Sequence, residues 1–339
     1  MKAAVITRSF NLEIWDVPQP VIGEYEALCK MDYGATCGGT DLRLMSGGHP
    51  NPIAYPTILG HESVGHVVEI GSKVKNLRVG DIVSRVGAPA WLTPELNASW
   101  GGFAEYGVAK DHRQMAQDGI DRKLWWSSRV NQVIPHEVDI KAAPMTITWR
   151  ETLSYIHRVG VRNGSRLLVI GSGANALAFA AHGINLGAVV YVVGNPQRAS
   201  DFSPFPIEGY FSYKDSSLSE QIKAALPNGA DFIIDGIGSS QAVNQSLCVL
   251  KPGGTVAVYG WNDRKTCGIN PFCASSSYFV YADGYDEPET HDQVMQWILE
   301  GKLNASHWYN LDAPVPLDKI SEAYDRLRAH QGLKYLIRL

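Results

Sequence analysis

The chain has 339 residues, a length that favours two domains over one. Hydrophobic residues make up 45% and charged residues 19% of it, which excludes a disordered protein and indicates a globular one. Basic and acidic residues nearly cancel to a formal net charge of -4, and no basic run could neutralise a row of phosphates, so nucleic acid is not an expected partner.

The first part of the chain, to about residue 143, consists of short runs rich in β-branched and aromatic residues. Turn residues, mostly glycine and proline, separate these runs. The pattern predicts an all-β domain. The expected strands cover residues 3–7, 27–33, 64–70, 81–86 and 103–108.

From about residue 140, helical stretches alternate with continuous apolar runs. A helical stretch reaches residue 159; apolar runs at 166–170, 189–193, 232–235 and 255–259 then alternate with helices at 175–186, 218–226 and 241–250. This alternation predicts a parallel sheet covered on both faces, that is, a doubly wound domain. A run at 278–282, helices at 287–300 and 317–330, and a strand at 335–339 close the chain.

Neither a membrane span nor a targeting segment is expected. No stretch approaches the ~18 uninterrupted apolar residues that a span requires, and the N-terminus reaches Arg8 too early for a secretory signal. Five dispersed cysteines do not make a disulfide framework for a chain of this length, so we expect reduced thiols. These features predict a cytoplasmic protein.

A glycine-rich turn at residues 171–176 fits the pattern G-x-G-x-x-A of dinucleotide-binding loops. Gly171 would make the tight turn, Gly173 would let the main chain approach a pyrophosphate, and Ala174 and Asn175 would open the helix whose N-terminus faces it. The turn follows an apolar run and precedes a helix, as such a motif requires. The alternative is a glycine-rich turn without a ligand.

The end of the second strand of the alternating region decides the expected cofactor. An acidic residue is expected there for the ribose of NAD, but Gly194 stands in its place. Asn195 and Arg198 follow and are suited to a 2'-phosphate, so the sequence favours NADP over NAD. The alternative is a plain turn with a solvated arginine.

Three residues of the β region are candidate metal ligands. Cys37 stands 24 positions before the adjacent pair His61 and Glu62. Thiolate, imidazole and carboxylate all bind zinc, and a catalytic zinc site uses three protein ligands with an open fourth position. Taken singly, each has a simpler explanation: a buried thiol, or a histidine and glutamate in an ordinary polar contact.

With these motifs together, the chain resembles the medium-chain, zinc-type alcohol and polyol dehydrogenase family. The resemblance implies a GroES-like β-barrel catalytic domain formed by residues 1–147 with 284–339, and an inserted Rossmann domain at 148–283. It also implies a cleft where nicotinamide meets zinc, and homodimers or homotetramers built through the nucleotide-domain sheet. The matching segments are 37–41, 55–62, 79–81, 101–106, the loop at 171 and 250–254.

The chain also departs from the family pattern. No cysteine occurs between Cys37 and Cys248, so we expect no structural zinc. The family's third ligand should fall at residues 146–148, where no good donor occurs; Glu62 is expected to complete the site, and Glu151 is a poorer candidate.

The proton relay of the family is also altered. Two glycines separate Cys37 from Thr40, and Arg43 replaces the relay histidine. Thr40 is the expected relay residue, with His49 as a stand-in at the mouth of the cleft. The aromatic loop 91–100 either borders the substrate cleft or packs on itself at the surface.

The resemblance predicts a zinc-dependent, NAD(P)-linked oxidoreductase that interconverts a secondary alcohol and its ketone by hydride transfer. Likeness to one branch of the family favours a polyol, sugar or cyclitol as the small-molecule substrate. One alternative is a zinc-independent, NADPH-dependent reductase of a C=C or iminium bond, motivated by the missing ligand. Another is a nucleotide-binding protein that has lost catalysis.

Overall fold

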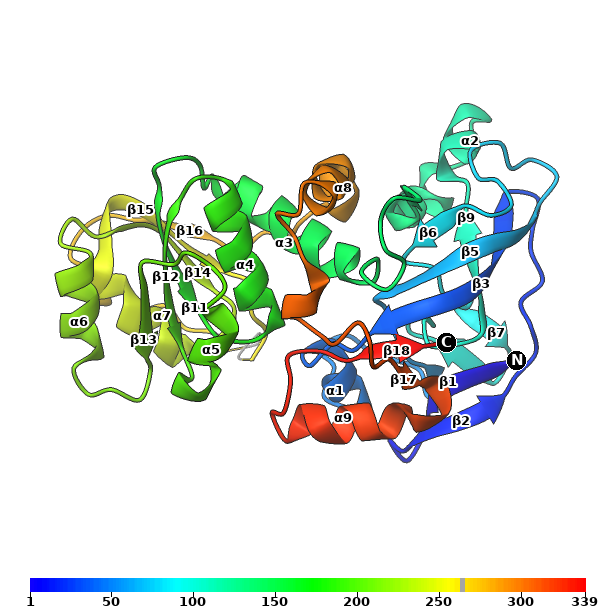
Figure 1. Cartoon of the computed structure of the whole chain (residues 1–339), viewed down its shortest axis with the longest axis horizontal. Helices are drawn as coiled ribbons and strands as arrows, with labels where there is room; N and C mark the ends of the chain where they lie inside the picture. Colours follow the sequence, from blue (N-terminus) through cyan, green and yellow to red (C-terminus); the bar gives the residue numbers. More distant parts are fainter. Residues whose placement is uncertain (263–265) are drawn as a thin grey trace. The chain divides into compact units, whose positions relative to one another are not determined.

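The computed structural model describes residues 1–262 and 266–339 (Figure 1). The chain divides into two compact units: Met1–Thr148 with Glu287–Leu339, and Trp149–Asp286. We call them the catalytic unit and the nucleotide unit. Among the described residues no helix has the length and apolar character that crossing a bilayer demands. All five cysteines are free thiols.

The catalytic unit is built on two β-sheets. The smaller sheet has the order β2 (Leu12–Asp16), β1 (Lys2–Ile6), β4 (Thr57–Ile58), β8 (Leu96–Ala98) and β7 (Trp91–Thr93). The larger has the order β10 (Val133–Ile134), β6 (Ile82–Ser84), β5 (Ser63–Ile70), β3 (Glu26–Ala35), β18 (Leu336–Arg338) and β17 (Val315–Pro316), with β9 (Tyr106–Lys110) also paired to β3. These sheets confirm the predicted β domain.

Two helices within the N-terminal region, α1 (Thr40–Met45) and α2 (His112–Gln117), correct the expectation that it is all β. The two helices expected near the end of the chain are present as α8 (His291–Leu299) and α9 (Ile320–Arg328). The six-residue helices α1 and α2 are too short to produce a readable periodicity, which is why the sequence did not reveal them. The strand expected at 103–108 begins only at Tyr106, because Phe103 instead packs in the core.

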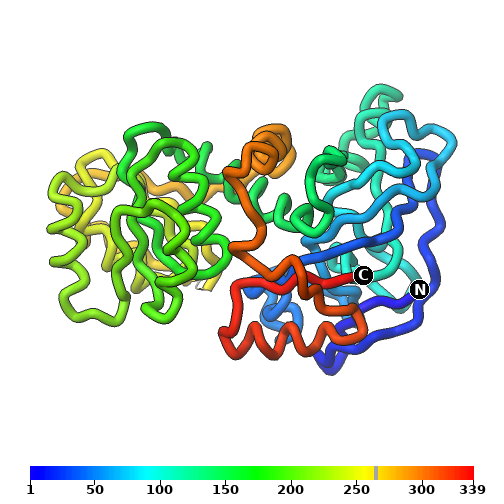
Figure 2. Tube along the Cα trace, viewed as in Figure 1, coloured from blue at the N-terminus to red at the C-terminus, as the bar shows by residue number. Residues whose placement is uncertain are grey.

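The end of the chain completes the catalytic unit. β18 pairs antiparallel with β3, with Leu336 opposite Ala35 and Ile337 opposite Gly34. Figure 2 shows this last segment of the chain running beside the first strands. Tyr324 of α9 and Ile337 share one hydrophobic core with residues of β1. Segments from both ends of the sequence therefore form a single core.

The nucleotide unit is a six-stranded, wholly parallel sheet flanked by helices. Its order is β13 (Gly209–Ser212), β12 (Val189–Gly194), β11 (Arg166–Ile170), β14 (Ala230–Asp235), β15 (Leu250–Val258) and β16 (Phe279–Tyr281). The helices are α3 (Met145–Val159), which begins in the catalytic unit, α4 (Ala174–Asn185), α5 (Ala199–Phe202), α6 (Leu218–Ala225) and α7 (Ser240–Ser246). The predicted doubly wound fold is confirmed.

Two details of the nucleotide unit differ from expectation. β13 was not predicted, because its four half-buried residues are too few to show an alternating pattern. The helix expected at 241–250 ends at Ser246, a 3-10 turn follows at Leu247–Val249, and Leu250 already opens β15.

Candidate functional site

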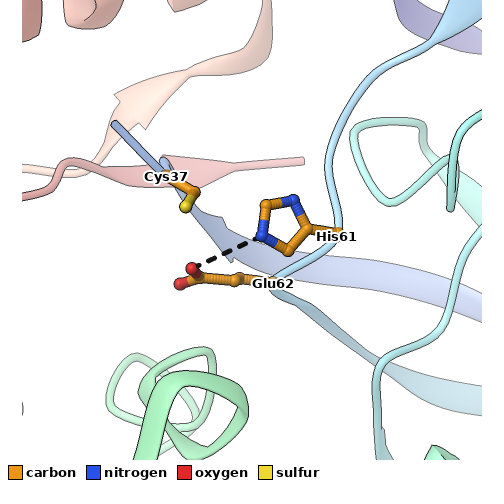
Figure 3. Close-up of side chains that lie close together, drawn as sticks. All are labelled: Cys37, His61 and Glu62. Carbon is orange, nitrogen blue, oxygen red and sulfur yellow. Dashed lines mark ion pairs between the residues drawn. The ribbon is translucent and has the colours of Figure 1, made fainter. Parts of the chain in front are cut away.

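The three predicted metal ligands come together in the catalytic unit. Cys37, His61 and Glu62 each offer one donor atom, and these atoms lie within 4.8 Å of one another. Figure 3 shows the three side chains converging, with Glu62 Oε1 3.7 Å from His61 Nε2. His61 and Glu62 are buried, and Cys37 is half-buried.

Strand pairing explains why these residues meet. Cys37 follows the end of β3, and Glu62 precedes the start of β5. The two strands are antiparallel neighbours, and Ala35 N donates a 2.7 Å hydrogen bond to the Glu62 carbonyl. Gly60, next to His61, has a φ of 97°, and a side chain there would lie 2.6 Å from the ring of Phe103, so only glycine allows this turn.

A buried carboxylate orients His61. Asp41 Oδ2 accepts hydrogen bonds from Cys37 N at 2.8 Å and from the Tyr324 hydroxyl at 2.7 Å, and Asp41 Oδ1 lies 3.2 Å from His61 Nδ1. The contact at Nδ1 is electrostatic and lacks hydrogen-bond geometry, and Nε2 faces Glu62. Burial opposes the charged form of His61, but contacts with Asp41 and Cys37 raise its pKa well above the ordinary value in the metal-free protein.

Glu62 has a partner that the sequence did not reveal. Lys334 is buried, and its Nζ lies 2.6 and 2.5 Å from the two carboxylate oxygens of Glu62. Burial opposes the charge of Lys334, but Glu62 and Cys37 together raise its pKa above the ordinary value, so the ammonium group stays charged. Lys334 and Tyr324 lie more than 270 residues from their partners in the sequence, and no local motif marks either.

The other candidate ligands lie elsewhere. Thr146 and Thr148, at the positions where the family's third ligand was expected to fall, are buried hydroxyl residues. Glu151 belongs to the nucleotide unit, on α3. The proposed relay residue Thr40 is the first residue of α1, three positions after Cys37, and is half-buried.

The loop 91–100 reaches the metal ligands at its last residue. The Trp100 ring centroid lies 5.5 Å from that of His61 and 6.2 Å from that of His49. Trp100 is 45% exposed and adopts a φ of 70°, a strained conformation for a bulky residue. Its indole is therefore placed as an apolar surface beside the donor set. Trp91, at the other end of the loop, is exposed.

The donor set suits zinc. A thiolate, an imidazole nitrogen and a carboxylate oxygen are all common zinc ligands, and three of them leave a coordination position for water or substrate. Their convergence within 4.8 Å is close enough for a single ion. The chemistry and geometry of these residues therefore fit the metal that the sequence predicts.

The glycine-rich loop has the predicted place between β11 and α4. Gly171 has a φ of 124°, and Gly173 forms the N-cap of α4, whose first residues are Ala174 and Asn175. A carbon added at Gly173 would meet no atom within 4 Å. The main chain at this helix N-terminus is therefore uncovered, as an anion site requires.

Beside the end of β12 lies Tyr210 of the neighbouring strand β13, a residue that the sequence did not point to. The Tyr210 hydroxyl donates a 2.7 Å hydrogen bond to the carbonyl of Asn195, whose N–H donates to Ser172 Oγ at 3.0 Å. A side-chain carbon at Gly194 would lie 2.2 Å from the Tyr210 oxygen. Tyr210 thus fills the space in which an acidic residue at 194 would stand.

Arg198 is partly committed to another charge. Its Nη1 lies 3.2 Å from Asp201 Oδ2, three residues further along the chain. The side chains of both residues are only partly exposed. Any contact of Arg198 with a phosphate must therefore compete with Asp201.

Comparison with known proteins identifies two family matches. "Alcohol dehydrogenase GroES-like domain" matches residues 23–117, and "Zinc-binding dehydrogenase" matches residues 169–300. A probable zinc-binding alcohol dehydrogenase of Mycobacterium tuberculosis is 26% identical, covering 100% of this chain and 88% of that protein. Sorbitol dehydrogenase of Bacillus subtilis is 23% identical, covering 91% and 88%.

The fold has a close counterpart among solved structures. A putative zinc-binding dehydrogenase from Sinorhizobium meliloti, solved bound to NADP, superimposes with a TM-score of 0.78. The alignment covers 100% of this chain and 99% of that chain at 22% sequence identity. At this identity the likeness shows a shared two-domain fold.

Proposed function

Because the chain belongs to the zinc-type medium-chain dehydrogenase/reductase family, we propose that it interconverts a secondary alcohol and its ketone by hydride transfer, with zinc and a nicotinamide cofactor. The observation that carries this proposal is the convergence of Cys37, His61 and Glu62, with Asp41 next to the ring of His61. These three residues would hold the metal. The loop at Gly171 and Gly173 would hold the cofactor pyrophosphate.

The residues around the donor set have separate tasks. A zinc ion, when bound, supplies Lewis-acid polarisation of the substrate oxygen. Asp41 orients the ring of His61 so that the Nε2 lone pair can bind the metal. Trp100 provides an apolar surface against which the carbon skeleton of the substrate packs. Thr40 Oγ1 accepts the alcohol proton and passes it toward solvent, since the residue is only half-buried.

We propose a polyol, sugar or cyclitol as the substrate. The support is likeness to relatives such as the sorbitol dehydrogenase of Bacillus subtilis, across most of both chains. An aromatic face such as that of Trp100 suits the C–H face of such molecules. Their many hydroxyls would need further polar partners.

NADP is the proposed cofactor over NAD. Because residue 194 is a glycine, no carboxylate there repels a 2'-phosphate. Tyr210 also leaves little room for a carboxylate side chain at this position. Arg198 supplies a positive charge at the same strand end, although Asp201 shares it. The NADP found with the Sinorhizobium meliloti protein is consistent with this choice.

We further propose a cytoplasmic homodimer or homotetramer. β16 is the last strand of the nucleotide sheet, and its residues Phe279 and Val280 are 67% and 50% exposed. An apolar sheet edge favours pairing with a second copy. Light scattering on wild type and Phe279→Asp tests this, because loss of the interface would halve the mass.

Five free thiols support the cytoplasm, a reducing compartment, as the location of the protein.

One experiment separates this function from its alternatives. Full-length protein purified without added zinc is analysed for metal and then assayed with sugars, cyclitols and simple alcohols, using both cofactors. We expect about one zinc per chain and turnover of at least one polyhydroxylated alcohol. Absence of bound zinc would instead support the zinc-independent reductase of a C=C or iminium bond. Cofactor binding without turnover of any alcohol or carbonyl compound would identify a protein that has lost catalysis.

A further inference from the structure

A lysine near the end of the chain, Lys334, pairs with Glu62, one of the three proposed metal ligands. Lys334 Nζ lies 2.6 and 2.5 Å from the two oxygens of Glu62 and 3.1 Å from the carbonyl oxygen of Thr36. Each of the three ammonium hydrogens can therefore meet an acceptor. The side chains of Lys334 and Glu62 are 1% and 4% exposed, so solvent does not screen the pair.

The main chain holds both partners of this pair in place. Tyr335 N donates to Thr36 Oγ1 at 2.9 Å, and Thr36 N donates to the Tyr335 carbonyl at 3.0 Å, which ties the residue after Lys334 to the residue before Cys37. The carbonyl of Glu62 accepts from the main chain at the end of β3. Only side-chain rotation can therefore separate the ammonium group from the carboxylate.

A metal ion at the donor set would have to share Glu62 with this ammonium group. A carboxylate has lone pairs for both partners, so sharing is geometrically allowed. Two cations on one carboxylate repel each other, and the repulsion is strong where water is excluded. Without the lysine, however, the metal-free protein would contain a buried carboxylate with no countercharge.

We propose that Lys334 is a positioning residue that competes with the metal for Glu62, so that it weakens metal binding and stabilises the metal-free protein. The inference rests on the proposed metal site. In the metal-free state Lys334 neutralises Glu62. In the metal-bound state the carboxylate divides between the ion and the lysine. The affinity of the site for metal is thus set by a residue that is not a ligand.

A zinc titration against a competing chelator tests this on full-length, metal-stripped protein. We expect Lys334→Met to bind zinc at least about tenfold more tightly than wild type, because one competitor for Glu62 is gone. Lys334→Arg, which keeps the charge, and Lys302→Met, which removes an exposed lysine paired with Glu300, should stay near wild type. The metal-free form of Lys334→Met should melt at a lower temperature than wild type, and zinc should abolish that difference.

Equal or weaker zinc binding by Lys334→Met would overturn the inference. The double variant Glu62→Gln/Lys334→Met removes both charges of the buried pair and provides a second, independent comparison in the Glu62→Gln background. We expect the gain from removing the lysine to shrink severalfold in the Glu62→Gln background. A gain of equal size in both backgrounds would show that Lys334 does not act through Glu62, and would also overturn the inference.

The same titration separates this inference from the proposed function. If Cys37→Ser binds zinc as tightly as wild type, the proposed metal site is wrong. If zinc binding depends on Cys37 but not on Lys334, the metal site stands and only the role of the lysine is wrong.

Discussion

At the proposed metal site, charged and polar side chains from distant parts of the chain hold one another: Lys334 pairs with Glu62, and the Tyr324 hydroxyl binds Asp41. The nucleotide loop instead consists of glycines and one uncovered helix N-terminus, and its residues come from one short segment. The first arrangement fixes a few atoms by buried ion pairs. The second leaves the main chain open for a ligand to approach.

This difference shows where each region is vulnerable. Removing one member of a buried ion pair leaves its partner without a countercharge, which costs folding stability as well as function. A change at an open loop alters ligand choice and leaves the core intact.

The largest effect is expected from removing a metal ligand. Cys37→Ser or His61→Ala should lose the metal and lower kcat/KM by more than about a hundredfold, because two remaining protein ligands hold zinc too weakly. The fold should persist, since neither residue belongs to the hydrophobic cores of the described chain. Metal analysis, kinetics and circular dichroism measure the three quantities. A variant that keeps zinc and activity would remove its residue from the site.

Glu62→Gln should damage both metal retention and stability. The variant loses a ligand and leaves the buried Lys334 without its carboxylate, which we expect to cost about 3 kcal/mol of unfolding free energy. Metal content and urea denaturation test the two effects. Glu151→Gln, in the nucleotide unit, is the control and should keep its metal. If it loses zinc while Glu62→Gln retains it, Glu151 is the third ligand.

A buried histidine makes the nucleotide unit sensitive to acid. Burial, with a smaller contribution from His157, lowers the pKa of His182 to about 3, and its Nε2 lies 3.0 Å from Thr152 Oγ1. The unfolded chain binds a proton near pH 6.5 and the folded chain does not, so this stability is present above pH 6.5 and lost as the pH falls toward 3.

Between pH 7.5 and 5 the loss should be about 2 kcal/mol. Urea denaturation at several pH values measures it. His182→Gln keeps a polar group for Thr152 but no titration, and should flatten the dependence; His136→Gln, at an exposed site, should not. An unchanged slope in His182→Gln would assign the acid sensitivity to another group.

The smallest effect is expected in cofactor choice. Arg198→Ala should reduce the kcat/KM preference for NADP over NAD by about tenfold, the value of one charge-assisted hydrogen bond. Asp201→Asn should raise the preference severalfold, because it frees Arg198 from its partner. Assays with both cofactors compare the two variants. A wild-type preference for NAD that Arg198→Ala leaves unchanged would mean that Asn195 or main-chain groups hold the ribose.

Regions built from residues close together in the sequence were easier to predict than regions built from distant residues. The nucleotide loop lies between one strand and one helix, so its motif predicted its place. Cys37, His61 and Glu62 were grouped from their ligand chemistry and the family resemblance, and the ends of two neighbouring strands bring them together.

Lys334 and Tyr324 could not be found in the same way. Each lies in a segment whose sequence shows only a strand or an amphipathic helix, and the tertiary fold alone brings it to the donors. Tyr210 was missed for a related reason, since it belongs to the short strand β13. The convergence of the three proposed ligands was therefore predictable, and the residues that contact them from distant segments were not.

The pairing of β18 with β3 also sets an order of assembly during synthesis. Lys334 follows Thr36 by 298 residues, so at a translation rate of ~5–20 residues per second it reaches the ribosome exit about 15 to 60 s later. The whole nucleotide unit emerges in that interval and can fold first. Meanwhile the end of β3 lacks its neighbour and Glu62 lacks its cation. In the growing chain the nucleotide unit is therefore complete before the catalytic unit can close.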